Sequence, residues 1–166
     1  MFAACDRVAE LMESEWSLIS CGCSAALLCI TAACIAGRDP EKMCRLPDST
    51  GMGNEVIVQR DQRDDYDAAV RMAGARLIEV SSIAELLTSI NRNTCMLLML
   101  GDADSGGLGI NATHKEISAA EMAAIGKQFG IPVVVDAAAE RPDVPNAYLA
   151  AGVDAVCYSG GKWWSF

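Results

Sequence analysis

Residues 118–140 read SAAEMAAIGKQFGIPVVVDAAAE, and this stretch decides the fold class of the 166-residue chain. Apolar residues recur at helical spacing from Ser118 to Gly130, and the run from Ile131 to Asp136 is apolar at nearly every position. A strand that is apolar on both faces is typical of a parallel sheet covered by helices on two sides. The stretch therefore predicts one helix–strand unit of an α/β fold, with the Asp136 carboxylate at the end of its strand.

The same alternation extends over the rest of the chain. Expected strands lie at residues 16–20, 55–58, 75–80, 94–100, 131–136 and 154–159. Expected helices lie at residues 3–14, 23–36, 65–74, 83–90, 118–130 and 144–152, and Asp39 and Pro40 begin a further turn. The pattern predicts a three-layer αβα architecture with a mostly parallel sheet.

Composition limits the function classes. A chain of this length forms one domain with a real core. A net charge of −9 without a basic cluster disfavours nucleic acid as a partner. The eight cysteines mostly lie inside apolar runs and form no CxxC pair, so they are interpreted as buried thiols of a reducing cytosol rather than as disulfides or metal ligands.

Membrane insertion is also disfavoured, although residues 18–37 are uncharged over about the length of a membrane span. The segment is dominated by Ala, Cys, Ser and Gly, which have weak transfer energies, and Gly22 divides it into a short strand and a helix. The first residues carry acids where a cleavable signal has bases. A cytoplasmic location without a membrane partner is expected.

Ligands of such sheets collect beyond the carboxyl ends of the strands. After Gly22, the amides of Cys23, Ser24 and Ala25 are expected to point outward at a helix N-terminus, which is the geometry of a phosphate site. A tight turn without a ligand is the alternative. The sequence GGLG at 106–109 lacks the strand and helix context of a dinucleotide fingerprint.

Two other strand ends carry reactive groups. Asp136 needs a cation or a donor, and the alanines after it leave room for a flat group, or it caps the next turn. Lys162 follows two glycines and is either a nucleophilic amine or a solvated loop residue. A phosphate cradle, a carboxylate for a ring nitrogen and a Schiff-base lysine are together what pyridoxal phosphate requires.

Three stretches carry a resemblance to a known family: GRDPEKMCRLPDSTGMGNEVIVQR, YDAAVRMAGARLIEV and IPVVVDAAAERPDVPNAYLAAGVDAVCYSGGK. They resemble pyridoxal-phosphate enzymes of the selenocysteine synthase (seryl-tRNA selenium transferase) type, and in particular the D-glucosaminate-6-phosphate ammonia-lyase subgroup. The likeness covers almost the whole chain, and the block from Asp136 to Lys162 is its most specific part. The implied fold is the fold type I, aspartate aminotransferase-like fold.

The resemblance implies a role for each matching residue. Lys162 would hold pyridoxal 5'-phosphate as an internal aldimine and act as the catalytic base, and Asp136 would pair with the pyridinium nitrogen. Ala138 would lie against the ring. Ser159 and the amides of Cys23 and Ser24 would hold the phosphate.

The sequence departs from the family pattern in two respects. Gln62 stands where the family has a histidine that stacks on the ring, and His114 lies too far along the chain to replace it. The resemblance also implies that residues 1–166 are an incomplete large domain, without the N-terminal region and the C-terminal small domain of the family. The aromatic end at Trp163, Trp164 and Phe166 is where the likeness stops.

The expected function is that of a lyase or transferase core acting on an amino acid or amino-sugar acid, through aldimine formation, α-proton abstraction and β-elimination. A non-catalytic fragment of such an enzyme is one alternative, and seryl-tRNA selenium transferase-like activity is the other. The acidic charge favours the small substrate, since tRNA needs a basic surface. A homo-oligomer is expected for the full-length family member.

Overall fold

The computed structural model describes residues 2–101 and 117–162. Its centre is a five-stranded sheet with the spatial order β2-β1-β3-β4-β5, in which every neighbouring pair is parallel. The strands are β1 (Glu55–Gln59), β2 (Arg76–Val80), β3 (Thr94–Leu100), β4 (Val133–Asp136) and β5 (Ala155–Cys157). Five of the six predicted strands are thereby confirmed within one or two residues.

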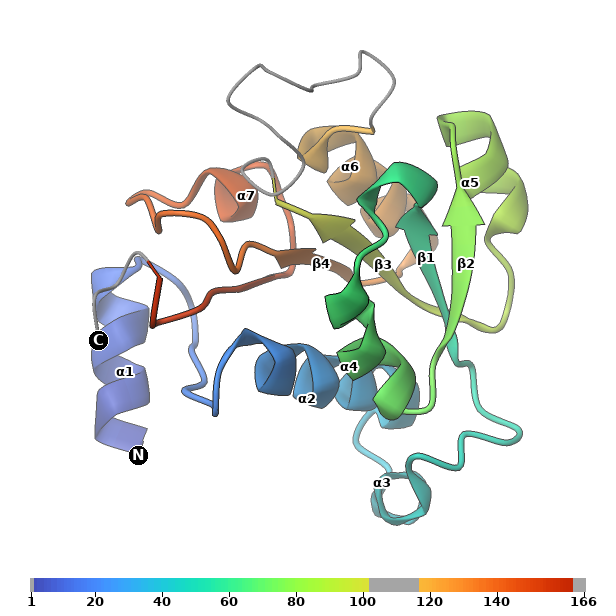
Figure 1. Cartoon of the computed structure of the whole chain (residues 1–166), viewed down its shortest axis with the longest axis horizontal. Helices are drawn as coiled ribbons and strands as arrows, with labels where there is room; N and C mark the ends of the chain where they lie inside the picture. Colours follow the sequence, from blue (N-terminus) through green and yellow to red (C-terminus); the bar gives the residue numbers. More distant parts are fainter. Residues whose placement is uncertain (1, 102–116, 163–166) are drawn as a thin grey trace.

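Helices cover both faces of this sheet (Figure 1). The helices are α1 (Phe2–Leu11), α2 (Cys23–Ala36), α3 (Pro40–Arg45), α4 (Ala68–Met72), α5 (Ile83–Ser89), α6 (Ala119–Phe129) and α7 (Ala147–Ala150), with the short 3-10 helices η1 (Arg60–Gln62) and η2 (Asp65–Asp67). Helices α2 and α4 lie on one face, and α5, α6 and α7 lie on the other. This is the predicted three-layer arrangement.

Alternate residues of each central strand enter two separate cores. Val56 of β1 and Val134 of β4 pack with Leu27 of α2 on one face, whereas Ile57 and Val135 pack on the α6 side. All five side chains are at most 2% exposed. Burial on both faces explains why the strand sequences are apolar throughout instead of alternating with polar residues.

Helix ends follow the capping residues of the sequence. The Asp39 side chain accepts the amides of Glu41 and Lys42 at the start of α3, where Pro40 occupies the first helical position. Ser118 and Glu121 form a reciprocal capping box at α6. The expected turn at residues 39–40 is thus the beginning of a six-residue helix.

One predicted strand is wrong. Residues 16–20 belong to none of the described strands, and Trp16 is 71% exposed, with Leu18 and Ile19 nearly half exposed. A strand forms only where a neighbour can satisfy its backbone groups, and the Ser17 hydroxyl instead donates to the carbonyl of Cys5 in α1. The predicted helix at 65–74 also differs, because η2 and α4 divide it.

The cysteines are only partly as predicted. Cys5, Cys23 and Cys157 are buried and Cys34 and Cys95 are half-buried, but Cys21, Cys29 and Cys44 are exposed. Burial raises the pKa of the Cys34 thiol to about 11 and that of Cys95 to about 12. The interpretation of the cysteines as buried thiols therefore fails for three of them, which lie on outward turns of α2 and α3 or before α2.

The apolar segment at residues 18–37 contains α2, which has 14 residues. Within residues 2–101 and 117–162, no helix combines the length and the apolar character needed to cross a bilayer. The same residues contain no group of three or more His, Cys, Asp or Glu side chains arranged to hold a metal ion.

Candidate functional site at the carboxyl edge of the sheet

The parallel topology brings four chain segments to one edge of the sheet. Gln62 follows β1, Gly101 follows β3, Asp136 ends β4, and the turn at Ser159–Lys162 follows β5. The N-terminus of α2 reaches this edge from below the sheet (Figure 1). Residues that are far apart in the sequence therefore lie together at the carboxyl ends of the strands.

Asp136 is the centre of this edge. The residue is 7% exposed, and its Oδ1 accepts a hydrogen bond from the Cys23 thiol at 3.2 Å and from the amide of Ala138 at 3.0 Å. The Ala138 contact is the turn-capping alternative expected from the sequence. The Cys23 contact was not predicted, and it fixes the start of α2 against the end of β4. Both donors reduce the cost of burying a carboxylate.

Cys23 connects Asp136 to the next strand. A hydrogen bond with Cys157, burial and the nearby Asp136 charge together raise the pKa of the Cys23 thiol far above its ordinary value. Cys157 lies opposite Asp136 in the β4–β5 register, and its carbonyl accepts the Ala137 amide at 2.9 Å. The Cys23 thiol is consequently a neutral donor and not a nucleophilic thiolate.

The N-terminus of α2 has the form expected of a phosphate site. Gly22 has a φ of 109° and provides no side-chain cap, a backbone conformation that residues other than glycine rarely adopt. The first amides of a helix have no acceptor within the helix, and here they belong to Cys23, Ser24 and Ala25. Ser24 is exposed, and a Cβ on Gly22 would meet nothing within 4 Å.

Gln62 lies on the same edge and is 5% exposed. Its Oε1 accepts a hydrogen bond from the amide of Leu100 at 3.0 Å, which ties η1 to the end of β3. Gln62 and Asp136 line one small cavity of about 20 Å³, together with Leu27, Val58 and other side chains. Such a volume has room for about one water molecule, so it is a packing gap beneath the edge and not a seat for a larger group.

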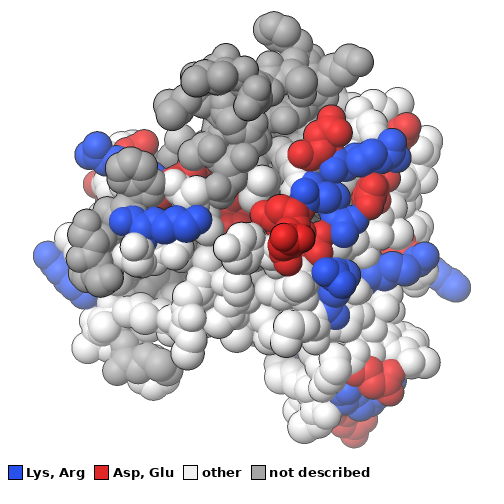
Figure 2. Space-filling model, viewed as in Figure 1, with Lys and Arg blue, Asp and Glu red and all other residues white. Residues whose placement is uncertain are grey.

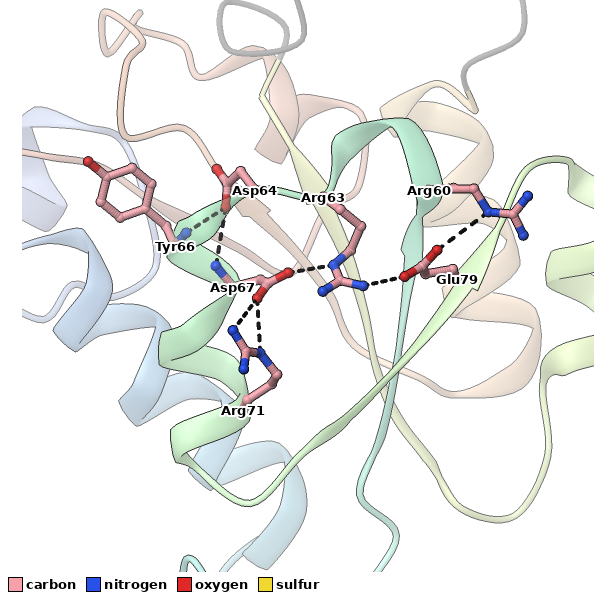
Figure 3. Close-up of polar contacts among 7 residues, drawn as sticks. All are labelled: Arg60, Arg63, Asp64, Tyr66, Asp67, Arg71 and Glu79. Carbon is pink, nitrogen blue, oxygen red and sulfur yellow. Dashed lines mark hydrogen bonds and ion pairs between the residues drawn. The ribbon is translucent and has the colours of Figure 1, made fainter.

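A network of ion pairs surrounds the segment that carries Gln62 (Figure 3). Arg63 lies between Asp67 and Glu79 and donates to both carboxylates. Arg71 binds Asp67 at 3.0 Å, and Arg60 lies 3.4 Å from Glu79. The hydrogen bond with Asp67 is the main reason why the pKa of Arg63 is raised. The network fixes the β1–α4 connection against β2.

Figure 2 shows that charged side chains gather over this connection, while much of the same face is uncharged. The network was missed in the sequence because its members are separated by up to 19 positions, from Arg60 to Glu79. The spacing of Arg63, Asp67 and Arg71 at four-residue intervals was the available signal.

The turn that carries Lys162 follows β5, but the Lys162 side chain is not bonded to the other candidate groups that the structure describes. The Lys162 amide donates to the carbonyl of Ser159 at 3.2 Å, and the Lys162 side chain is exposed. Among the described residues it forms no hydrogen bond or ion pair with Asp136 or Cys23. Ser159 is half-buried, and a Cβ on Gly161 would meet nothing within 4 Å.

Residues that follow β4 and β5 form a second polar group that sequence reasoning missed. The Tyr148 hydroxyl donates to Glu140 at 2.5 Å, and the Asn146 amide donates to the Tyr158 hydroxyl at 2.5 Å. Burial raises the pKa of Tyr158. A Cβ on Gly101 would collide with the Glu140 carboxylate, so the absent side chain of Gly101 allows Glu140 to cover the end of β3.

Several sequence features lie outside the described residues. These are the GGLG stretch at 106–109, His114, and the aromatic residues Trp163, Trp164 and Phe166.

The chain has the fold of fold type I pyridoxal-phosphate enzymes, over part of a domain. The solved structure of a D-glucosaminate-6-phosphate ammonia-lyase superposes with a TM-score of 0.87 at 29% identity, over 99% of this chain and 45% of that one. Other structural neighbours, including the Sphingomonas wittichii serine palmitoyltransferase, with a TM-score of 0.61 at 18% identity, share the fold. The fold class predicted from the sequence is confirmed.

Curated relatives show which enzymes with this fold the chain resembles in sequence. A 5'-C-glycyluridine monooxygenase-decarboxylase of Streptomyces sp. is 31% identical, over 96% of this chain and 41% of its own length. The D-glucosaminate-6-phosphate ammonia lyase of Salmonella typhimurium is 32% identical, over 95% of this chain and 43% of its own length. L-seryl-tRNA(Sec) selenium transferases of Escherichia coli are 29% identical, over 96% of this chain and 42% of theirs.

The resemblance to the ammonia lyases and selenium transferases is therefore confirmed, and these homologues are pyridoxal-phosphate lyases or transferases. No family model matches the chain. The chain spans about two fifths of the length of the curated relatives it matches.

Proposed function

We propose that this chain forms the cofactor-binding core of a pyridoxal-phosphate lyase or transferase that acts on an amino acid or amino-sugar acid. The observation that carries the proposal is the Cys23–Asp136 contact at 3.2 Å. It puts a buried carboxylate beside helix amides that have no acceptor within the helix, on the sheet edge where the Lys162 turn begins. A carboxylate, a phosphate cradle and an amine are the donor set that this cofactor needs.

Each residue has a distinct task in this proposal. Asp136 would pair with the ring nitrogen, and Ala138, whose small side chain follows it, would lie against the ring. The α2 amides of Cys23 and Ser24, with Ser159, would hold the phosphate through hydrogen bonds and the helix dipole. Lys162 would hold the aldehyde carbon through Nζ.

The bound cofactor supplies an electron sink for the carbanion that forms when the substrate loses its α proton. Lys162, once its Nζ is released, would take that proton, and β-elimination would follow. Gln62 would lie at the position from which the family histidine contacts the ring. Its amide cannot accept a proton at neutral pH, so Gln62 would orient groups and transfer no proton.

The choice of substrate rests on charge. The relatives named above differ in activity while their identities to this chain are nearly equal. With a net charge of −9 the chain repels phosphate backbones, and the arginines at the carboxyl edge are already paired with Asp67 and Glu79. Both facts favour a small amino-sugar acid or amino acid over seryl-tRNA.

Replacement of the lysine tests the proposal. The wild-type chain is mixed with pyridoxal phosphate, and absorbance near 420 nm is recorded before and after removal of unbound cofactor. We expect Lys162→Ala to abolish the absorbance near 420 nm that remains after unbound cofactor is removed. The matched control Lys127→Ala removes an exposed lysine of α6 and should keep it. A colourless wild-type chain, or a band of equal height in Lys162→Ala, would overturn the proposal.

A further inference from the structure

The carboxylate of Asp136 is held by a side chain that comes from the opposite end of the sequence. Cys23 and Asp136 are separated by 113 positions, and their contact is buried. Cys23 is the first residue of α2, so it offers two different groups to the same region. Its amide belongs to the helix N-terminus, whereas its thiol donates to Oδ1 of Asp136.

We infer that Cys23 is a positioning residue for Asp136, and that its thiol keeps this carboxylate charged and aligned for a cationic ring nitrogen. The inference rests on the proposed function. A donor to a carboxylate favours the charged form over the neutral acid. The thiol also limits rotation of the carboxylate, because the Cys23 side chain is itself packed among Leu27, Val134 and Cys157.

Cys157 completes the arrangement. It lies opposite Asp136 in the β4–β5 register and belongs to the same apolar cluster as Cys23. The three side chains therefore form a row from β5 through the start of α2 to the end of β4. Within this row the contact with the Asp136 carboxylate is made by Cys23, and the buried Cys5 of α1, which lies outside the row, provides a matched control.

The roles of the Cys23 thiol and the Cys23 amide are separable by mutation. Cys23→Ala removes the thiol donor and leaves every backbone amide of α2 in place. Cys23→Ser keeps a donor at the same position. Cys5→Ala removes a buried thiol that lies outside the row. Circular dichroism and thermal melting first establish that each variant is folded.

Binding of two ligands is then compared by spectroscopic titration. The first is pyridoxal phosphate, and the second is its 1-deaza analogue, in which carbon replaces the ring nitrogen. We expect Cys23→Ala to weaken pyridoxal phosphate on the order of tenfold, as loss of a hydrogen bond to a charged group predicts. The deaza analogue should bind both proteins equally, and Cys23→Ser and Cys5→Ala should resemble the wild type.

A second measurement needs no cofactor. Alkylation of Cys23 by iodoacetamide at pH 8 is followed by peptide mass spectrometry, with the exposed Cys44 as internal reference. Removal of the adjacent negative charge in Asp136→Asn should accelerate alkylation of Cys23 relative to Cys44 by about tenfold per unit of thiol pKa lost.

The outcomes separate this inference from the proposed function. A wild-type chain that binds neither ligand sinks the proposed function, and the alkylation ratio then decides alone whether Asp136 holds the thiol. Equal weakening of both ligands by Cys23→Ala, or an unchanged alkylation ratio in Asp136→Asn, overturns the positioning role. Selective weakening of pyridoxal phosphate with rescue by Cys23→Ser supports it.

Discussion

Gln62 is a buried polar side chain that joins two segments at the edge of the sheet. Its amide oxygen satisfies the backbone N–H of Leu100 at the end of β3, and this contact joins the segment after β1 to the strand beside it. Gln59 does the same three residues earlier, because its amide exchanges two hydrogen bonds with the backbone of Ile117. Two glutamines thus connect the carboxyl end of β1 to other segments at this edge.

Removal of the Gln62 acceptor should destabilise the fold. Gln62→Leu keeps the volume and leaves the Leu100 amide without its partner, so the free energy of unfolding should fall by about 1–3 kcal/mol. Gln62→Glu keeps an acceptor but buries a second carboxylate in the cavity that Asp136 lines, so it should lose more. Urea unfolding measures the change, with Gln128→Leu at an exposed position of α6 as control. Equal stability of wild type and Gln62→Leu would show that the Leu100 contact contributes nothing.

At the scale of the element, local signals in the sequence predicted most helices because their ends are chemically marked. Helix α2 begins after Gly22 and ends before Gly37, as expected, and α6 lies between Ser118 and Gly130. The strand expected at 16–20 failed because an apolar run shows that a segment can be buried, but not that a neighbouring strand is available. Strand formation depends on that distant partner.

Gly126 marks a close approach between an element and the strand that follows it. A Cβ at this position of α6 would collide with Val133 and lie 2.7 Å from the carbonyl oxygen of Ile131. Both obstacles belong to the α6–β4 unit whose sequence decides the fold class. The glycine is therefore needed for packing, although glycine is a poor helix former.

Gly126→Ala should lower the free energy of unfolding by about 1–3 kcal/mol, because overpacking outweighs the gain in helix propensity. The control Ala124→Gly, on the exposed side of α6, reports propensity alone and should cost about 1 kcal/mol. Both values come from urea or thermal unfolding. If Gly126→Ala were instead more stable than the wild type, propensity would dominate and the close approach would be unimportant.

At the scale of the whole molecule, the sequence was sufficient to place the candidate residues at one edge of the sheet but not to describe their contacts. Asp136 and Lys162 were predicted at the same edge because parallel strands end on a common edge, a rule that needs only the order of the elements. The Cys23 thiol, Glu140 and Tyr158 were missed because their partners depend on how side chains from separate elements are oriented. Topology is encoded by local patterns, whereas side-chain contacts are decided by the assembled packing.

The proposed site is spread over several elements, and this predicts how a bound cofactor would change the free energy of unfolding of the whole domain. The proposed site draws on α2, β4 and the segments after β1 and β5, so a ligand that contacts all of them is lost only when the three layers separate. Pyridoxal phosphate at about 100 times its dissociation constant should stabilise the fold by about 2.7 kcal/mol. For a domain of this size that raises the melting temperature by roughly 5–10 °C.

Pyridoxal is the matched ligand for this measurement, because it carries the same aldehyde and lacks the phosphate. Random reaction with exposed lysines such as Lys42 and Lys127 would affect both ligands alike, whereas a phosphate cradle at the N-terminus of α2 favours only the phosphate ester. Differential scanning fluorimetry should therefore show a large shift with pyridoxal phosphate and a small one with pyridoxal. Equal shifts would mean that no cradle operates and that the α2 amides have a purely structural role.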